Sequence, residues 1–600
     1  MATSTTPPHR LLLLTAIAAG LGVAGGGAAW VLLHLIGLIT NLALFRRAGW
    51  QVPPFDHLAR TPVIPIAAVC GALLVSLLAR WAPVIRGHGI PEAMEVILTR
   101  QSRIAPRAAV AKPLSAAIAI GTGGPFGAEG PIIVTGGAIG SLVGQLVPVS
   151  PSERKILLAC GAAAGMAATF GAPLAAVVLA IELLLFEFTT RAFVPLAMAA
   201  AVAAAMHDRL LGAGPLFAVP AHRFPGLASL PAFAVLGVAC GLVAVLVARG
   251  LFVFEAGFRR LPVGEFWHPV IGAVGFATVG LAVPRVLGVG YAVIGDILHN
   301  RLAVATVAVL AGAKLVAWWI ALASGTSGGT LAPILLVSAG FGSLFGAAVE
   351  RLMPNLGVTP SACALVAMAA VFGAATRAGL TGIVFVFELT RDYQSVVPLM
   401  VATVLADLVA ATMLDESIMT DKLARRGLRV SNEYEVDVLR TARIGDIMSA
   451  DVETLPASAT VGDARDRMAA GRHGAYPIIG ADGSPLAIVS RGDLLRDGAG
   501  DGDALIDHCS RDLVTVGPDD TAVTALHLML EEGIEHVPVL SGGALVGIVT
   551  RTDLLRVRGD RLAHEQTQHG ALAPVARRIG RHAGQALDRV VPRRRGDSGP

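Results

Sequence analysis

Long apolar stretches alternate with short polar connections over the first two thirds of the chain. They lie at residues 11–44, 61–80, 131–148, 156–186, 192–212, 230–250, 267–288, 303–323, 330–349, 361–388 and 396–414. A simple helix needs about 20 apolar residues to cross a bilayer, and several of these stretches are shorter or are interrupted by Gly and Pro. Interrupted helices are stable at membrane depth only where protein or a water-filled cavity satisfies their backbone. The pattern therefore predicts a multi-pass α-helical membrane domain with broken helices around an internal site.

The two halves of this region repeat each other with an offset of 202 residues, the difference between positions 127 and 329. The matched residues are identical: Gly127, Pro131, Ile132, Gly140, Ser141, Leu142 and Gly144 match Gly329, Pro333, Ile334, Gly342, Ser343, Leu344 and Gly346. After a four-residue insertion, Glu182 matches Glu388. A duplicated membrane domain places its site between the halves, near the middle of the bilayer.

A region of different composition follows residue 422, with dense charged residues. Its run SRGDLL, Ser490–Leu495, repeats as TRTDLL, Thr550–Leu555. Thr460 and Asp463 form a capping-box pattern at a helix start, and the apolar, β-branched run Ala544–Thr550 is typical of a strand. We therefore expect two small α/β modules after the membrane domain. The predicted division is an N-terminal segment at 1–10, the membrane domain at 11–430, the modules at 442–498 and 505–560, and a basic tail at 561–600.

Composition agrees with a membrane domain. The 600 residues are 54% hydrophobic and only 15% charged, whereas soluble proteins carry about 25% charged residues. The net charge of +4 falls largely on arginines of the C-terminal tail, which we expect to be solvated or to contact anionic lipid. No nucleic-acid partner is indicated. The five cysteines are too scattered to form a disulfide or metal framework.

Glu129 is the most informative single residue. It lies in the uncharged run GPFGAEGPII, with no basic residue closer than Lys112. A charged side chain at the bilayer centre costs about 2.5 to 3.5 kcal/mol, so such acids usually face a pathway or a partner. Pro131 suits the first turn of a helix, whose unpaired amides attract anions. A carboxylate that competes with an anion for these amides would be a gate that opens when it is protonated or moves away.

Two further segments have the same Gly and Pro pattern. Gly329–Pro333 (GTLAP) lacks the acid, so its helix would bind an anion through backbone amides alone, and Gly87–Glu92 (GHGIPE) is the other segment. Neutral amides bind an anion weakly enough to release it, which conduction requires. Together, the three segments predict a path for anions.

These three segments resemble the signature segments of the CLC family of chloride channels and chloride–proton exchangers. The resemblance covers roughly residues 11–430. It implies a duplicated, inverted-repeat helical domain that forms a homodimer. The expected substrates are chloride and other small anions. The resemblance makes Glu129 the gating glutamate, and it makes Lys112 a recurrent lysine of the family. The anion-binding residues implied are His88, Gly89, Ile90, Gly127, Gly130, Gly329, Thr330, Leu331 and Met419.

Four positions depart from the family pattern. His88 replaces an anion-binding serine, Met419 replaces a tyrosine, Ala128 replaces an arginine, and Leu183 occupies the place of a proton-relay glutamate. His88 either favours anion occupancy when protonated or is a neutral histidine bonded to the backbone. Glu182 either joins Glu129 in a proton route or is a helix-end acid facing the cytoplasm. We therefore favour a chloride channel of the voltage-gated type; a proton-coupled chloride antiporter is the alternative, and a CBS-regulated cation transporter is a more distant one.

The C-terminal repeat resembles a pair of CBS domains. This resemblance implies a cytoplasmic regulatory module, and hence cytoplasmic termini in a cell membrane. Ser490, Asp493, Thr550 and Asp553 would face the phosphate and ribose of an adenine nucleotide, or would have turn and capping roles instead. Anion passage itself requires no cofactor.

No enzyme is expected, although three patterns imitate enzyme motifs. Gly20-x-Gly22-x-x-Gly25 lacks the preceding strand of a dinucleotide site. Ser327 lacks the His and Asp partners of a hydrolase serine. His564 and His569 are five positions apart, whereas two zinc ligands on one helix face are four apart.

Overall fold

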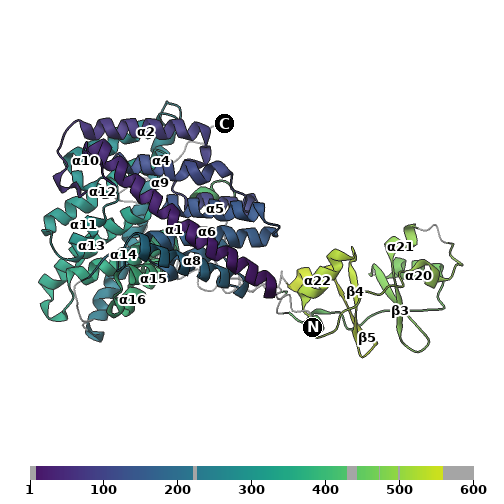
Figure 1. Ribbon diagram of the computed structural model, residues 1–600. Coiled ribbons are helices and arrows are strands. Elements are labelled where there is room, and N and C mark those ends of the chain that lie inside the picture. The colour runs from purple at the N-terminus through teal and green to yellow at the C-terminus, as the bar shows by residue number, and fades with distance from the viewer. Residues whose placement is uncertain are drawn as a thin grey trace, which may run out of the picture. The chain divides into compact units, whose positions relative to one another are not determined.

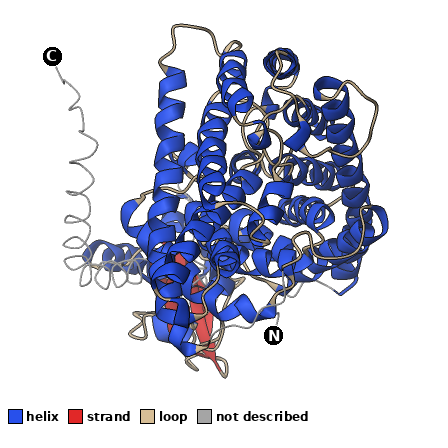
Figure 2. Ribbon diagram, turned by 90° about the vertical axis from the view of Figure 1, so that its left-hand side faces the viewer, coloured by secondary structure: helices blue, strands red, loops and turns tan. Residues whose placement is uncertain are grey.

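The computed structural model describes residues 8–219, 226–428, 439, 442–471, 473–496 and 500–557. The chain divides into two compact units, residues 1–433 and 434–600 (Figure 1). Helices make up the described part of the first unit, and the strands lie in the second unit (Figure 2). The predicted basic tail at 561–600, with His564 and His569, lies outside the described residues, as do the first seven residues of the predicted N-terminal segment.

The first half of the membrane unit contains eight α-helices among its described residues. They are α1 Pro8–Leu44, α2 Val63–Trp81, α3 Ile90–Thr99, α4 Pro106–Gly121, α5 Glu129–Leu146, α6 Pro151–Phe170, α7 Pro173–Ala180 and α8 Thr190–Leu210. A π-helical segment, Ile181–Leu185, continues α7. Short 3₁₀ turns lie at Phe55–His57 and Pro83–Ile85.

The second half repeats this order. Its helices are α9 Leu230–Arg259, α10 His268–Ala282, α11 Tyr291–Leu298, α12 Val304–Ala323, α13 Leu331–Leu352, α14 Pro360–Thr376, α15 Gly379–Thr390, α16 Val396–Met413 and the short α17 Asp421–Ala424. The 3₁₀ turns lie at Leu227–Ser229, Pro284–Val286, Pro354–Leu356 and Tyr393–Ser395. Among the described residues, seven helical segments are long and apolar enough to cross a membrane, so the predicted multi-pass α-helical fold is confirmed.

A reciprocal backbone contact relates the two halves. The N–H of Gly127 donates to the carbonyl of Gly329 at 3.2 Å, and the N–H of Gly329 donates back to the carbonyl of Gly127 at 2.8 Å. Such an exchange between equivalent residues is the mark of a two-fold axis, which here passes between Gly127 and Gly329. The helices α5 and α13 both begin at this point, and the fold is the inverted-repeat membrane domain that was expected.

Small residues allow the helices to pack closely. Gly22 of α1 packs against α8, where an added Cβ would lie 2.7 Å from the carbonyl of Ala199. Gly25 of α1 faces Ala164 of α6, where an added Cβ would lie 2.8 Å from the Ala164 Cβ. The fingerprint-like glycines of the first apolar stretch therefore serve helix packing, as is usual in membrane helices.

The second unit holds two sheets. Strands β1 Leu455–Pro456, β2 Ala475–Ile479 and β3 Pro485–Ser490 form one sheet, and β4 His536–Ser541 and β5 Ala544–Thr550 form the other. Its α-helices are α19 Ile444–Ile447, α20 Val461–Ala470, α21 Arg491–Arg496 and α22 Ala522–Glu531, with a 3₁₀ turn at Leu505–His508. The predicted capping box is confirmed, because Asp463 N donates to Thr460 Oγ1 at 3.2 Å and Thr460 N donates to Asp463 Oδ2 at 2.8 Å.

The two modules exchange segments. Ile444 is buried in the hydrophobic core of the second module, and Ser449 pairs with Ile548 of β5. Leu505 is buried in the core of the first module, and Ser510 pairs with Ile488 of β3. Each folded module therefore includes a short segment that adjoins the other module in the sequence.

Candidate functional site

Three loops meet where α3, α5 and α13 begin. The Gly87–Gly89 loop precedes α3, and both of its glycines have positive φ, +101° and +107°, a conformation that favours glycine. An added Cβ on Gly130 would lie 1.8 Å from the carbonyl oxygen of His88, and one on Gly89 would lie 2.4 Å from the carbonyl oxygen of Gly130. The glycines of the signature segments are therefore required for this close approach of backbones.

Glu129 lies at the junction of the two halves. It is the first residue of α5, and its side chain is fully buried. The hydroxyl of Tyr291 donates to its Oε1 at 2.7 Å. Oε2 has no hydrogen-bond partner of regular geometry among the described residues, although the backbone amides of Glu129 and Ala332 lie close enough to interact with the carboxylate. The carboxylate thus lies between the first turns of α5 and α13, at two helix N-termini of the kind that attract negative charge.

Glycines make room for this carboxylate. An added Cβ on Gly127 would lie 1.6 Å from Glu129 Oε2, and one on Gly329 would lie 2.8 Å from the same oxygen. Any larger residue at Gly127 would displace the glutamate side chain.

Not all predicted anion-binding amides are free in this structure. The N–H of Gly89 donates to Glu92 Oε2 at 2.6 Å, and the amides of Gly127 and Gly329 bond to each other's carbonyls. Each of these three amides therefore already has a partner in this conformation, and the place of Gly89, Gly127 and Gly329 in an anion site stays a prediction. Ile90, Gly130, Thr330 and Leu331 do lie at the first turns or the N-cap of α3, α5 and α13, as predicted.

His88 is buried beside this junction without a partner. It is 1% exposed, and neither ring nitrogen has a hydrogen-bond partner among the described residues. The interpretation of His88 as a histidine whose ring bonds to the backbone is therefore wrong.

Met419 is fully buried in the segment between α16 and α17. Ser417 Oγ accepts from the Met419 amide at 3.2 Å, and the following helix α17 packs against α3. This part of the chain is therefore near α3 in space, although it lies more than 300 residues away in the sequence.

Lys112 has a structural role in this conformation. Its fully buried Nζ donates to the carbonyls of Ile85 and Gly87 at 2.7 and 2.8 Å. The lysine therefore stabilises the Gly87–Gly89 loop through these two hydrogen bonds, and its side chain does not extend to the membrane interface.

Glu182 contacts the opposite half. Its Oε2 accepts from the amide of Thr381 at 2.9 Å and from the hydroxyl of Thr381 at 2.6 Å, in the first turn of α15. Leu183, in the place of the relay glutamate, is buried and apolar. The geometry therefore gives Glu182 a helix-capping role between the halves.

The sequence reasoning missed Tyr291 and Lys314. Lys314 Nζ donates to the carbonyls of Val286, Gly288 and Val289 at 3.0, 2.6 and 3.4 Å, as Lys112 does to the matching loop of the first half. The duplication contained the signal, because Lys314 lies 202 positions after Lys112. With the offset shortened by one residue, to 201, Gly87 and Gly89 match Gly288 and Gly290, which form a second GxG loop followed by Tyr291.

The candidate nucleotide residues bond within their own modules. Asp493 Oδ2 accepts from the amide and hydroxyl of Ser490 at 2.8 and 2.7 Å, and Asp553 Oδ2 accepts from those of Thr550 at 2.9 and 2.7 Å. These contacts cap the turn at the end of β3 and β5, which agrees with the structural interpretation and leaves the second carboxylate oxygen of Asp493 for other contacts.

Comparison with known proteins agrees with both units. Residues 70–411 match the family described as "Voltage gated chloride channel", and residues 444–500 and 505–560 match the CBS domain. The H(+)/Cl(-) exchange transporter ClcA of Vibrio parahaemolyticus serotype O3:K6 (strain RIMD 2210633) is 30% identical over 70% of this chain and 91% of that protein. The chloride channel protein CLC-f of Arabidopsis thaliana is 26% identical over 92% of this chain and 80% of that protein. A solved structure of a slow cyanobacterial Cl-/H+ antiporter is 26% identical, with a TM-score of 0.63 over 70% of this chain and 99% of that chain.

Proposed function

Because this chain belongs to the voltage gated chloride channel family and carries two CBS domains, we propose that it conducts chloride along a path between its two halves, gated by Glu129. The observation that carries this proposal is the buried carboxylate of Glu129 at the joined N-termini of α5 and α13. Helix N-termini attract negative charge. An anion and the Glu129 carboxylate therefore compete for one place, and chloride passes when the carboxylate is protonated or moves away.

Chloride flow in this protein is not tightly coupled to protons. Leu183 replaces the acid that would relay protons, and Glu182 is engaged with Thr381 of α15. Antiport is the second candidate, favoured by the similarity to proteins named as exchangers. An exchanger would need a proton path that does not use Glu182.

The reversal potential of the purified protein in planar bilayers distinguishes the two. Under opposed chloride and proton gradients, a channel gives the chloride Nernst potential, and an exchanger gives a potential that shifts with the proton gradient. A potential that follows a cation gradient and ignores chloride would contradict both.

Glu129→Gln tests the gate. Its neutral amide cannot compete with chloride as a charge, so we expect flux that no longer depends on pH. Glu350→Gln, on the exposed last turn of α13, is the matched control and should behave as the wild type. An unchanged pH dependence in Glu129→Gln would reject Glu129 as the gate.

The resemblance to CLC proteins also supports a homodimer in a cell membrane, with the CBS pair and both termini in the cytoplasm. Mass photometry in lipid nanodiscs would measure the subunit number. Labelling of cysteines introduced at exposed positions of the second unit, from one side of intact cells, would test the orientation.

An adenine nucleotide at the CBS pair would regulate the flux. Support comes from the equivalent Ser490–Asp493 and Thr550–Asp553 pairs of the two modules. Titration calorimetry with ATP and AMP should show binding that Asp493→Asn weakens. Thr460→Ala, which changes the capping box of α20 instead, is the control, and absence of heat with either nucleotide would reject the site.

A further inference from the structure

Tyr291 joins the second GxG loop to the gating glutamate. It is the first residue of α11, and its hydroxyl is 2.7 Å from Glu129 Oε1. We propose that Tyr291 is a second gating residue, whose hydroxyl holds the Glu129 carboxylate in the anion path until this hydrogen bond breaks. This inference rests on the proposed role of Glu129 as the gate. Tyr291 acts through Glu129 and is therefore a positioning residue.

The Tyr291 ring is held in place by aromatic neighbours. It packs edge-to-face against Phe170, at a centroid distance of 6.4 Å, and against Phe217, at 5.8 Å. This arrangement is the favourable one for aromatic pairs. The ring therefore stays fixed if the hydroxyl alone is removed, and Phe is a suitable replacement.

Two glycines and a buried lysine restrain the loop before Tyr291. Gly288 and Gly290 have positive φ, +64° and +94°, and the buried Lys314 bonds to three carbonyls of this loop. The same arrangement in the first half orients His88 and the start of α3.

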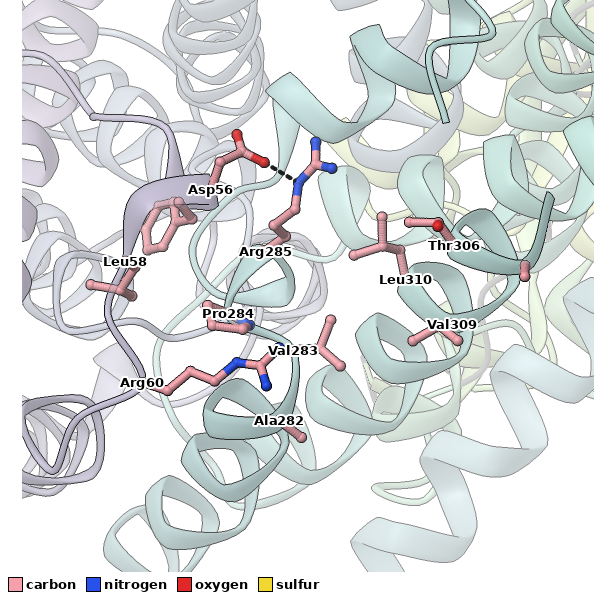
Figure 3. Close-up of a pocket in the computed structure, with 12 residues that line it drawn as sticks. Asp56, Leu58, Arg60, Ala282, Val283, Pro284, Arg285, Thr306, Val309 and Leu310 are labelled. Atoms are coloured by element: carbon pink, nitrogen blue, oxygen red, sulfur yellow. Dashed lines mark ion pairs between the residues drawn. The ribbon is translucent and has the colours of Figure 1, made fainter. Parts of the chain in front are cut away.

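Ion pairs of Arg285 also restrain this loop. The Arg285 Nε lies 2.6 Å from Asp56 Oδ1, and its Nη2 lies 2.5 Å from Asp296 Oδ2 on α11. Figure 3 shows Asp56 and Arg285 pointing toward each other across the edge of a pocket of about 490 Å³. The hydroxyl of Tyr291 is therefore presented to Glu129 by a loop with little freedom to move.

Tyr291 also separates Glu129 from a pocket. It lines a pocket of about 380 Å³ together with Phe217, His299 and Arg301. Since the hydroxyl bonds to Glu129 and the ring borders this pocket, an anion arriving from this side meets Tyr291 before Glu129. Arg301 Nη1 lies 3.6 Å from Asp296 Oδ1 in the same pocket, so the charges that line this approach are paired.

The buried charged side chains of the two GxG loops have partners of their own. Lys314 of α12 donates to the carbonyls of Val286, Gly288 and Val289. Lys112 of α4 is engaged with its own loop, and Glu92 of α3 caps its own helix. The hydroxyl of Tyr291 is therefore a principal stabiliser of the ionised carboxylate, because a hydrogen bond to a charged group favours the charged form.

The test is the pH dependence of chloride flux in liposomes that contain full-length protein. In Tyr291→Phe, the ionised gate is less stable, so the pH of half-maximal flux should rise by about one unit. In the Glu129→Gln background, the same substitution should produce no shift. Tyr393→Phe, at a residue that is 77% exposed, is the matched control and should leave the profile unchanged.

The outcomes separate this inference from the proposed function. If Glu129→Gln changes the pH profile and Tyr291→Phe does not, the glutamate is the gate and the inference about Tyr291 is wrong. A shift of equal size with and without Glu129 would also overturn it, because Tyr291 would then act through something else. If Tyr291→Phe does not fold, 3-fluorotyrosine at position 291 keeps the hydroxyl as a stronger donor and should lower the pH of half-maximal flux; an unchanged profile would contradict the inference.

Discussion

Glu182 and Glu388 occupy equivalent positions in the two halves, and each caps a helix of the opposite half. Glu182 accepts from the amide and hydroxyl of Thr381 in α15, and Glu388 accepts from the amides of Leu174 and Ala175 in α7, at 3.0 and 2.7 Å. This reciprocal contact links the halves through charge-assisted hydrogen bonds at two helix N-termini.

Glu182→Gln should therefore lower stability and leave proton dependence unchanged. The amide keeps one acceptor oxygen but loses its charge, so we expect a loss of about 1 kcal/mol in the free energy of unfolding. Thermal unfolding in detergent would measure it, and Glu388→Gln should show a loss of similar size. Loss of pH-dependent flux in Glu182→Gln at normal stability would instead indicate a proton route.

Gly127→Ala should open the gate. An added methyl group would lie 1.6 Å from Glu129 Oε2, so the carboxylate must leave its position between α5 and α13. We expect chloride flux with weakened pH dependence, measured in liposomes. Gly27→Ala is the control, because an added Cβ at this helical position meets nothing within 4 Å. A wild-type pH profile in Gly127→Ala would contradict the position of the glutamate.

Lys314→Met should destabilise the second half about as much as Lys112→Met destabilises the first. Each substitution leaves buried carbonyls of a GxG loop without a donor, at a cost of about 3 kcal/mol in total. Differential scanning calorimetry of the two variants would measure this. A loss in Lys112→Met alone would show that the two loops are not equivalent.

His88→Leu should weaken the stabilisation of the protein by chloride. Both ring nitrogens of His88 are buried without a partner, and an unsatisfied buried polar group costs about 1 to 3 kcal/mol. We expect the leucine variant to unfold at a temperature equal to or above that of the wild type in chloride-free buffer. Added chloride should stabilise the wild type more than this variant, and equal chloride stabilisation of both proteins would exclude His88 from the anion site.

Acid should destabilise the first CBS module through Asp463. The amide and hydroxyl of Thr460 hold the pKa of Asp463 below its ordinary value. A depressed pKa contributes stability above the unfolded-state pKa, and this stability is lost as pH falls through the folded-state pKa. In Thr460→Val, the protection of the α20 amides against hydrogen exchange should fall less steeply from pH 6 to pH 3 than it does in the wild type. Equal slopes in the two proteins would show that the capping box has no such effect.

The apolar stretches predicted most long helices, because spanning length and composition dominate the pattern in a membrane. They missed α3, which has ten residues, α4, whose Ala-rich sequence contains Lys112, and α11, which has only eight residues. The stretch at 156–186 divides into α6 and α7 because Gly171 ends α6 at a φ of +63°. Short helices carry too few residues for a periodic signal, and for this reason Tyr291 was not predicted.

The site itself was predicted in part. The glycine and proline motifs correctly indicated three helix starts near Glu129, since these residues have local backbone roles. Which amides remain free depends on contacts between loops more than 200 residues apart, such as that between Gly127 and Gly329. Tertiary pairing of this kind leaves no trace in local sequence.

The exchange of segments between the CBS modules has a practical consequence. A fragment cut near residue 500 would separate Ile444 from the core it fills and Leu505 from the core it completes. Chimeras that swap one CBS domain along its sequence boundary would therefore damage both modules. Functional dissection of the pair requires point substitutions or transfer of the whole region from residue 442 onward.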